Sequence, residues 1–120
     1  MPEILIVEDN LLNLLVEVDL LKSFGYEPKK AKDGLEALKV LDEIKVDLIL
    51  LDMELPKMHG LELLRRIKLN PETANTRVVA VTGYCDAESE QNLLKAGCYA
   101  VLSKPINFGN FRSQLEKFLT

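Results

Sequence analysis

The sequence lacks the features that mark several large classes of protein. It contains no tryptophan and only two cysteines, and no apolar run approaches the roughly 18 residues of a membrane-spanning helix. Acidic residues outnumber basic ones and give a formal net charge of −4, which argues against a nucleic-acid-binding surface. We therefore expect neither a membrane segment nor a nucleic-acid partner.

The cysteines and the first residues indicate the cellular compartment of the protein. Cys85 and Cys98 match neither the spacing of a metal site nor a disulfide framework, so we expect reduced thiols. The first residues run into an apolar segment without a basic region, so no secretory signal is predicted. Both observations are typical of a cytoplasmic protein.

The sequence does contain a regular alternation of short apolar runs and helical patterns. The apolar runs, with one more polar segment, predict five strands at about residues 4–7, 26–31, 46–51, 78–81 and 99–102. Between and after them, helical patterns predict five helices at about residues 11–24, 34–44, 60–69, 87–96 and 107–119. Right-handed crossovers make such a chain an α/β doubly wound parallel sheet, covered on both faces. At this length we expect a single three-layer domain over residues 1–120.

The central run, residues 46–51, ends abruptly on a carboxylate, Asp52. Its near-continuous apolar character is typical of a strand buried on both faces. Pro56 and Gly60 then impose a loop before the next helical pattern. A carboxylate at this end of a central parallel strand lies where open α/β sheets bind ligands. Taken alone, Asp52 is explained more simply as a residue that caps a turn.

Polar side chains stand at the ends of four predicted strands, and in a parallel sheet these ends meet at one edge. The side chains are those of Glu8, Asp9, Asp52, Thr82 and Lys104. Three carboxylates in one crevice repel one another, so they hold a proton or recruit a cation, and Mg²⁺ prefers oxygen ligands. The hydroxyl and the ammonium are then available for an anion. Such a site can place a phosphoryl group on an aspartate as an acyl phosphate.

With Pro105 after Lys104, this set of residues resembles the receiver domain of two-component response regulators over the whole chain, and is closest to single-domain regulators of the cell-cycle or relay type. The resemblance implies a flavodoxin-like (βα)5 fold with strand order 2-1-3-4-5 and a cis Lys104–Pro105 bond. It implies that Asp52 accepts a phosphoryl group from a phosphohistidine on a sensor histidine kinase or a histidine phosphotransfer protein. It also implies self-catalysed phosphorylation, slow autodephosphorylation and an unidentified downstream protein target.

The same resemblance implies a ligand for each member of the site. Mg²⁺, with Mn²⁺ as a substitute, would be held by Asp9, Asp52 and the backbone carbonyl of Glu54, with Glu8 acting through water. The phosphoryl oxygens would be bound by Thr82, Gly83 and Lys104. The phosphodonor would dock on the first helix and the last loop, where Pro105 lies.

The first predicted helix carries more apolar residues than one buried face requires. Leu11, Leu15 and Val18, spaced by four and three residues, could form a second, solvent-side stripe that packs against the helices of the phosphodonor. The alternative is that these residues extend the core.

Two positions depart from the family pattern. Val101 stands where the family usually has a switch aromatic, and strand alternation would place Tyr99 on the same face. Tyr84, two residues after Thr82, is unusually bulky, and we expect its ring to limit the access of water to an acyl phosphate. We expect His59 to be a solvated loop residue and Cys98 to be packed rather than reactive.

Two other functions remain open from the sequence. Val101 is compatible with a receiver-fold binding module whose output does not use phosphorylation. An aspartyl-phosphate phosphohydrolase would need a second aspartate two residues after Asp52, and that position is Glu54.

Overall fold

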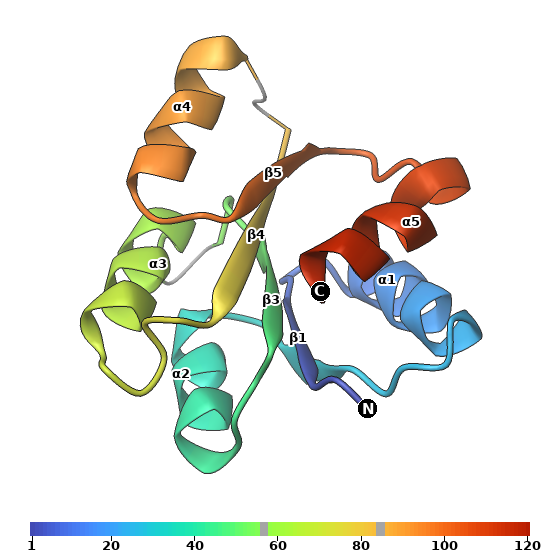
Figure 1. The fold of residues 1–120 in the computed structure, drawn as a ribbon, viewed down its shortest axis with the longest axis horizontal. Coiled ribbons are helices and arrows are strands. Elements are labelled where there is room, and N and C mark those ends of the chain that lie inside the picture. The colour runs from blue at the N-terminus through green and yellow to red at the C-terminus, as the bar shows by residue number, and fades with distance from the viewer. Residues whose placement is uncertain (56–57, 84–85) are drawn as a thin grey trace.

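Within the residues that the structure describes, five strands and five helices alternate along the chain, as the sequence pattern predicts (Figure 1). The structure is a computed structural model and describes residues 1–55, 58–83 and 86–120. The strands are β1 (Ile4–Val7), β2 (Lys29–Ala31), β3 (Leu48–Asp52), β4 (Arg77–Thr82) and β5 (Ala100–Ser103). The helices are α1 (Leu11–Ser23), α2 (Gly34–Glu43), α3 (Gly60–Leu69), α4 (Ala87–Lys95) and α5 (Phe108–Phe118).

The strands form one parallel sheet in the order β2-β1-β3-β4-β5. Helices α1 and α5 cover one face of the sheet, and α2, α3 and α4 cover the other (Figure 1). The predicted doubly wound architecture and its strand order are therefore confirmed. Because all strands are parallel, the polar residues that follow them reach the same edge of the sheet.

The sheet is buried on both faces, so its strands are apolar throughout rather than alternating with polar residues. In β1, Leu5 and Val7 pack into the core under α2–α4, whereas Ile4 and Ile6 pack into the core under α1 and α5. In β3 the side chains divide between the two cores in the same way. This packing fixes the backbone of both strands immediately before Glu8 and before Asp52.

Asparagine and aspartate side chains cap four of the helices at this edge of the sheet, and Asn107 caps α5 by accepting from the Gly109 amide. The side chains of Asn10, Asp33 and Asp86 accept hydrogen bonds from the amides of residues 13, 36 and 89, which begins α1, α2 and α4. The chain leaves α1 through Gly25 at φ +95°, a conformation that strongly favours glycine. The helix predicted over about residues 11–24 is therefore confirmed, with α1 ending at Ser23.

Tyr99 is not on the side of the sheet that strand alternation predicts. It precedes β5, and its ring lies edge-on to Phe118 of α5, with centroids 6.2 Å apart. The Arg77 guanidinium lies 4.5 Å from the Tyr99 ring centroid and donates a 2.8 Å hydrogen bond to the Phe118 carbonyl. Val101 instead packs against the core under α2–α4. The prediction of a shared face was wrong because regular alternation begins only where the strand begins.

No helix in the described parts of the chain has both the length and the apolar character needed to cross a membrane. Cys98 is buried beside Lys68, and burial raises the pKa of its thiol to about 11 despite the nearby positive charge. The expectation that Cys98 is packed is confirmed, and its raised pKa disfavours the reactive thiolate form.

Candidate functional site

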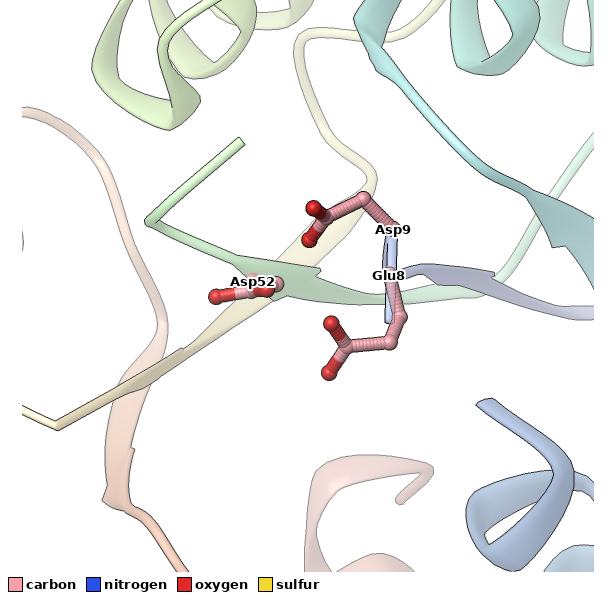
Figure 2. Close-up of side chains that lie close together, drawn as sticks. All are labelled: Glu8, Asp9 and Asp52. Atoms are coloured by element: carbon pink, nitrogen blue, oxygen red, sulfur yellow. The ribbon is translucent and has the colours of Figure 1, made fainter. Parts of the chain in front are cut away.

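Three carboxylates converge at the ends of β1 and β3 (Figure 2). One carboxylate oxygen from each of Glu8, Asp9 and Asp52 lies within 4.8 Å of the others. Glu8 and Asp52 are only 2 % and 3 % exposed, whereas Asp9 is exposed. Because β1 and β3 are neighbouring strands in register, residues separated by more than forty positions form one cluster.

Lys104, which directly follows β5, connects this cluster to the ends of β4 and β5. Its Nζ atom lies 2.8 Å from Asp52 Oδ1 and 3.9 Å from Glu8 Oε1. Partial burial alone would lower the pKa of Lys104, but the carboxylates of Asp52, Glu8 and Glu54 outweigh it and raise the pKa. The Lys104 amide also donates to the Thr82 carbonyl at 2.9 Å, and the Lys104–Pro105 bond is cis, as predicted.

Because Glu8 and Asp52 are buried side by side, a state in which both carboxyl groups are ionised is unfavourable. Burial, and then contact with the Asp52 carboxylate, raise the pKa of Glu8 to about 8. A polar environment partly offsets this, because the Asn10 amide donates to Glu8 Oε2 at 3.2 Å. In the absence of a cation the cluster therefore retains a proton near neutral pH.

Glu17 is a fourth carboxyl group of this region, and the sequence reasoning missed it. It lies on α1, is 7 % exposed and contacts Glu8, and burial raises its pKa to about 7. A signal for it was present in the sequence. Glu17 follows Leu14 by three residues and precedes Leu21 by four, so helical spacing places it on the inward face.

Glu54 also contributes a side chain that the sequence reasoning did not assign, since only its backbone carbonyl was expected at the site. Its carboxylate accepts hydrogen bonds from Thr82 Oγ1 at 3.1 Å and from the Gly83 amide at 3.2 Å. The Glu54 amide in turn donates to Asp52 Oδ1 at 3.1 Å. The end of β3 is thereby connected to the end of β4.

A cavity of about 390 Å³ opens beside the cluster, between α1 and the segment that joins β5 to α5. Glu8, Glu17 and Lys104 give it polar walls, and Val16, Pro105, Ile106 and Phe108 contribute apolar ones. The cavity therefore joins the buried acidic cluster to the exposed surface of α1.

The predicted apolar stripe on α1 is partly wrong. Leu11 and Leu15 are 66 % and 48 % exposed, but Val18 is only 5 % exposed and packs into the core under α1 and α5. Val18 follows Leu14 by four residues and shares its buried face, which the expected stripe did not take into account. The exposed apolar surface of α1 consists of Leu11, Leu12, Leu15 and Val16.

Two other residues singled out in the sequence are not part of the acidic cluster as the structure describes it. His59 is exposed, as expected, and its Nδ1 atom accepts from the Leu61 amide at 3.5 Å at the start of α3. Tyr84 lies outside the described residues.

The chemistry of the acidic cluster fits a magnesium site. Its ligands are carboxylate oxygens, which Mg²⁺ prefers, and Asp9 leaves one side of the cluster accessible from solvent. Repulsion among buried carboxylates is relieved when a divalent cation binds. The convergence of Glu8, Asp9, Asp52, Thr82 and Lys104 at one edge is as the sequence predicts.

Comparisons with known proteins agree with this geometry. The profile of the response regulator receiver domain matches residues 4–116. The polar-differentiation response regulator DivK of Brucella anthropi is 38% identical over 120 residues, which cover 99% of this chain and 98% of DivK. DivK of Brucella ovis is also 38% identical, over 97% of this chain and 94% of its own.

Solved structures show the same fold. The chemotaxis protein CheY4 of Vibrio cholerae superposes with a TM-score of 0.92 at 27% identity, covering 99% of both chains. The receiver domain of the sensor histidine kinase PA1611 from Pseudomonas aeruginosa has a TM-score of 0.89 at 30% identity, covering 98% of this chain and 97% of its own. That structure contains a magnesium ion coordinated in its active-site cleft.

Proposed function

The chain belongs to the response regulator receiver family, and on that premise we propose that Asp52 accepts a phosphoryl group from a phosphohistidine. The observation that carries the proposal is the position of Asp52. It lies within the acidic cluster and 2.8 Å from Lys104, at the edge where Thr82 and Gly83 present a hydroxyl and an amide. Lys104, Thr82 and the Gly83 amide bind the oxygens of the transferred group.

The transfer exchanges one bond to phosphorus for another. Asp52 Oδ2 attacks phosphorus, because Oδ1 is the oxygen that accepts from Lys104 and from the Glu54 amide. The bond between phosphorus and the donor imidazole nitrogen breaks, and its electron pair stays on that nitrogen. A donor ring that is protonated on its other nitrogen then leaves as neutral imidazole. Lys104 stabilises the negative charge of the phosphoryl oxygens as they approach, which is the main contribution a protein makes to such transfers. Hydrolysis of the acyl phosphate by water later restores Asp52.

The acidic cluster of Glu8, Asp9 and Asp52 would hold the metal that this reaction needs. Asp9, Asp52 and the backbone carbonyl of Glu54 are the proposed ligands of Mg²⁺, for which Mn²⁺ would substitute, and Glu8 acts through water. When bound, the ion offsets the negative charge of Asp52 and of the incoming phosphoryl group. Glu8 and Asp52 are held ready for this role by the packing of β1 and β3.

Receiver domains are phosphorylated by histidine kinases. We propose that a sensor kinase or a histidine phosphotransfer protein docks on the exposed part of α1, at Leu11 and Leu15, and against Pro105. The exposure of both leucines and the adjoining cavity support this surface, because exposed apolar residues that cluster commonly mark binding sites. The match to DivK covers nearly all of that protein, which favours action as a stand-alone cytoplasmic regulator that signals through protein contacts.

A second function is favoured by one observation. Val101 occupies the usual switch position and packs into the core under α2–α4, so no ring at that position turns inward when Asp52 is modified. A receiver-fold module whose output does not depend on phosphorylation would not need such a ring.

Intact-protein mass spectrometry after incubation with Mg²⁺ and acetyl phosphate tests the proposal. We expect the mass of one phosphoryl group on the wild-type chain and none on Asp52→Asn. If no phosphoryl mass appears, the proposal is wrong and the second function is favoured. If the mass survives in Asp52→Asn, the proposal is wrong because another residue accepts the group.

A further inference from the structure

The Glu54 side chain reaches from the loop after β3 to the end of β4. Its Oε2 atom lies 3.1 Å from Thr82 Oγ1, and its Oε1 atom lies 3.2 Å from the Gly83 nitrogen. The two oxygens of one carboxylate thus accept from two neighbouring donors. A single anion is bound at two points by the chain itself.

These two donors are the ones assigned above to the phosphoryl oxygens. An amide has one hydrogen to donate, and so does a hydroxyl, so each can make one strong hydrogen bond to one anion at a time. The Glu54 carboxylate and a phosphoryl group on Asp52 therefore cannot both be fully bound by Thr82 and Gly83. Their negative charges also repel each other across this short distance.

We propose that Glu54 is a resident competitor for the phosphoryl site, which must release Thr82 and Gly83 before Asp52 can hold a phosphoryl group. The inference rests on the proposed function and adds a residue that sets how readily the site accepts its donor. Glu54 is a residue that regulates occupancy and does not itself react.

The burial of the residues involved suits such an exchange. Thr82 is buried, so its hydroxyl stays at the site, whereas Glu54 is exposed and its carboxylate can move into water without loss of hydration. Asp52 and Glu54 are also joined through the Glu54 amide, so the competitor begins only two residues from the acceptor. The contact can therefore open without disturbing the core under the strands.

The size of the effect follows from the fraction of molecules in which the contact is open. If the closed form is favoured by about one charge-assisted hydrogen bond, roughly one molecule in ten is open, and the apparent affinity for a phosphodonor falls about tenfold. Glu54→Ala removes both bonds and the charge. Glu54→Gln removes the charge but retains an oxygen that can accept, so its effect should be smaller.

We would measure the rate of Asp52 phosphorylation at limiting acetyl phosphate and saturating Mg²⁺, after determining the Mg²⁺ affinity of each variant. The expected order is Glu54→Ala about tenfold faster than wild type, with Glu54→Gln between them. Glu43→Ala and Glu43→Gln are the matched controls. Glu43 is exposed at the last residue of α2, at the opposite edge of the sheet, and its variants remove the same charge. Both controls should react at the wild-type rate.

The amide resonance of Gly83 provides a reading that does not depend on phosphorylation. In metal-free protein it should move upfield in Glu54→Ala, because the amide loses a charged acceptor, and should stay in place in Glu43→Ala. An unmoved Gly83 resonance overturns the competitor, whatever the rates show.

The rates separate the two proposals. If the wild-type chain acquires a phosphoryl group and Glu54→Ala is no faster than Glu43→Ala, the competitor is refuted and acceptance by Asp52 stands. If no variant acquires one even at high donor concentration, acceptance by Asp52 fails, and the competitor fails with it.

Discussion

The two halves of the strand-end site solve opposite electrostatic problems. At the ends of β1 and β3, buried carboxylates outnumber the cations near them, and Lys104 is the cation that contacts Asp52. At the end of β4, two donors face an exposed carboxylate, that of Glu54. The carboxylates of the acidic half repel one another and raise the pKa of Glu8, whereas the donors of the second half already bind an anion from the chain. On the proposed function, each half would therefore bind its ligand by replacing a group that is already there.

The difference in burial determines what each exchange costs. In the acidic half Glu8, Asp52 and Glu17 are buried against the sheet and α1, so their carboxyl groups have little freedom to move. In the donor half the displaced group is an exposed side chain that swings into solvent. Lys104 contacts the acidic half directly and is hydrogen bonded through its backbone to Thr82, so it is the residue on which both halves depend.

Among the variants proposed here, replacement of Lys104, which contacts both halves of the site, should have the largest effect on phosphorylation. We expect Lys104→Met to slow phosphorylation by acetyl phosphate by on the order of 100-fold, because it removes a fixed positive charge aimed at the phosphoryl oxygens. Lys104→Arg, which keeps the charge in another shape, should lose less. The rates are measured by intact mass at saturating Mg²⁺. A Met variant within threefold of wild type would mean that the two halves do not act through Lys104.

The next effect isolates the acidic half. Glu8 and Glu17 have folded-state pKa values of about 8 and about 7, above the usual value near 4.5. The folded state therefore binds more protons than the unfolded state between about pH 4.5 and 8, so the free energy of unfolding falls as the pH rises through this window. Without divalent metal, we expect a loss on the order of 2 kcal/mol, measured by urea denaturation.

Glu17→Gln is the control for that profile, because it removes one buried carboxyl group and leaves the three clustered carboxylates in place. Its profile should be flatter than that of the wild type, and saturating Mg²⁺ should raise stability most at the alkaline end. A wild-type stability that rises with pH across this window would show that the acidic half holds no proton.

The smallest effect concerns the surface beside the cavity. We expect Leu15→Lys to slow phosphorylation by a phosphorylated histidine phosphotransfer protein by roughly tenfold, because a charge enters an apolar contact. Phosphorylation by acetyl phosphate should not change. Leu35→Lys, at an exposed leucine of α2 beyond the opposite face of the sheet, is the matched control. Equal slowing with both donors, or in both variants, would remove α1 from the docking surface.

The sequence was sufficient for the fold and for the residues that end the strands. Apolar runs predict buried strands, and a polar residue at the end of such a run marks the carboxyl end of the strand, so Asp52, Thr82 and Lys104 could be placed at one edge from the sequence alone. Helix spacing also pointed to Glu17, although the residue was not recognised as part of the site.

What the sequence could not give depends on side chains that cross between elements. The reach of Glu54 to Thr82 and Gly83 depends on the course of the loop after β3, which no local pattern specifies. The wrong prediction of the face on which Tyr99 lies has a similar origin. Because Tyr99 precedes β5, strand alternation does not set its side of the sheet, and its ring instead packs against Arg77 and against Phe118 of a distant helix.

Asp52 should be the residue that is phosphorylated, with the acidic half and the donor half of the site both acting on its carboxylate. Borohydride reduces an aspartyl acyl phosphate to homoserine and leaves other carboxylates unchanged, so peptide mapping after acetyl phosphate treatment locates the modified residue. The account predicts homoserine at position 52 and nowhere else, and none when Mg²⁺ is removed. Homoserine at another acidic position, with position 52 unmodified, would contradict it.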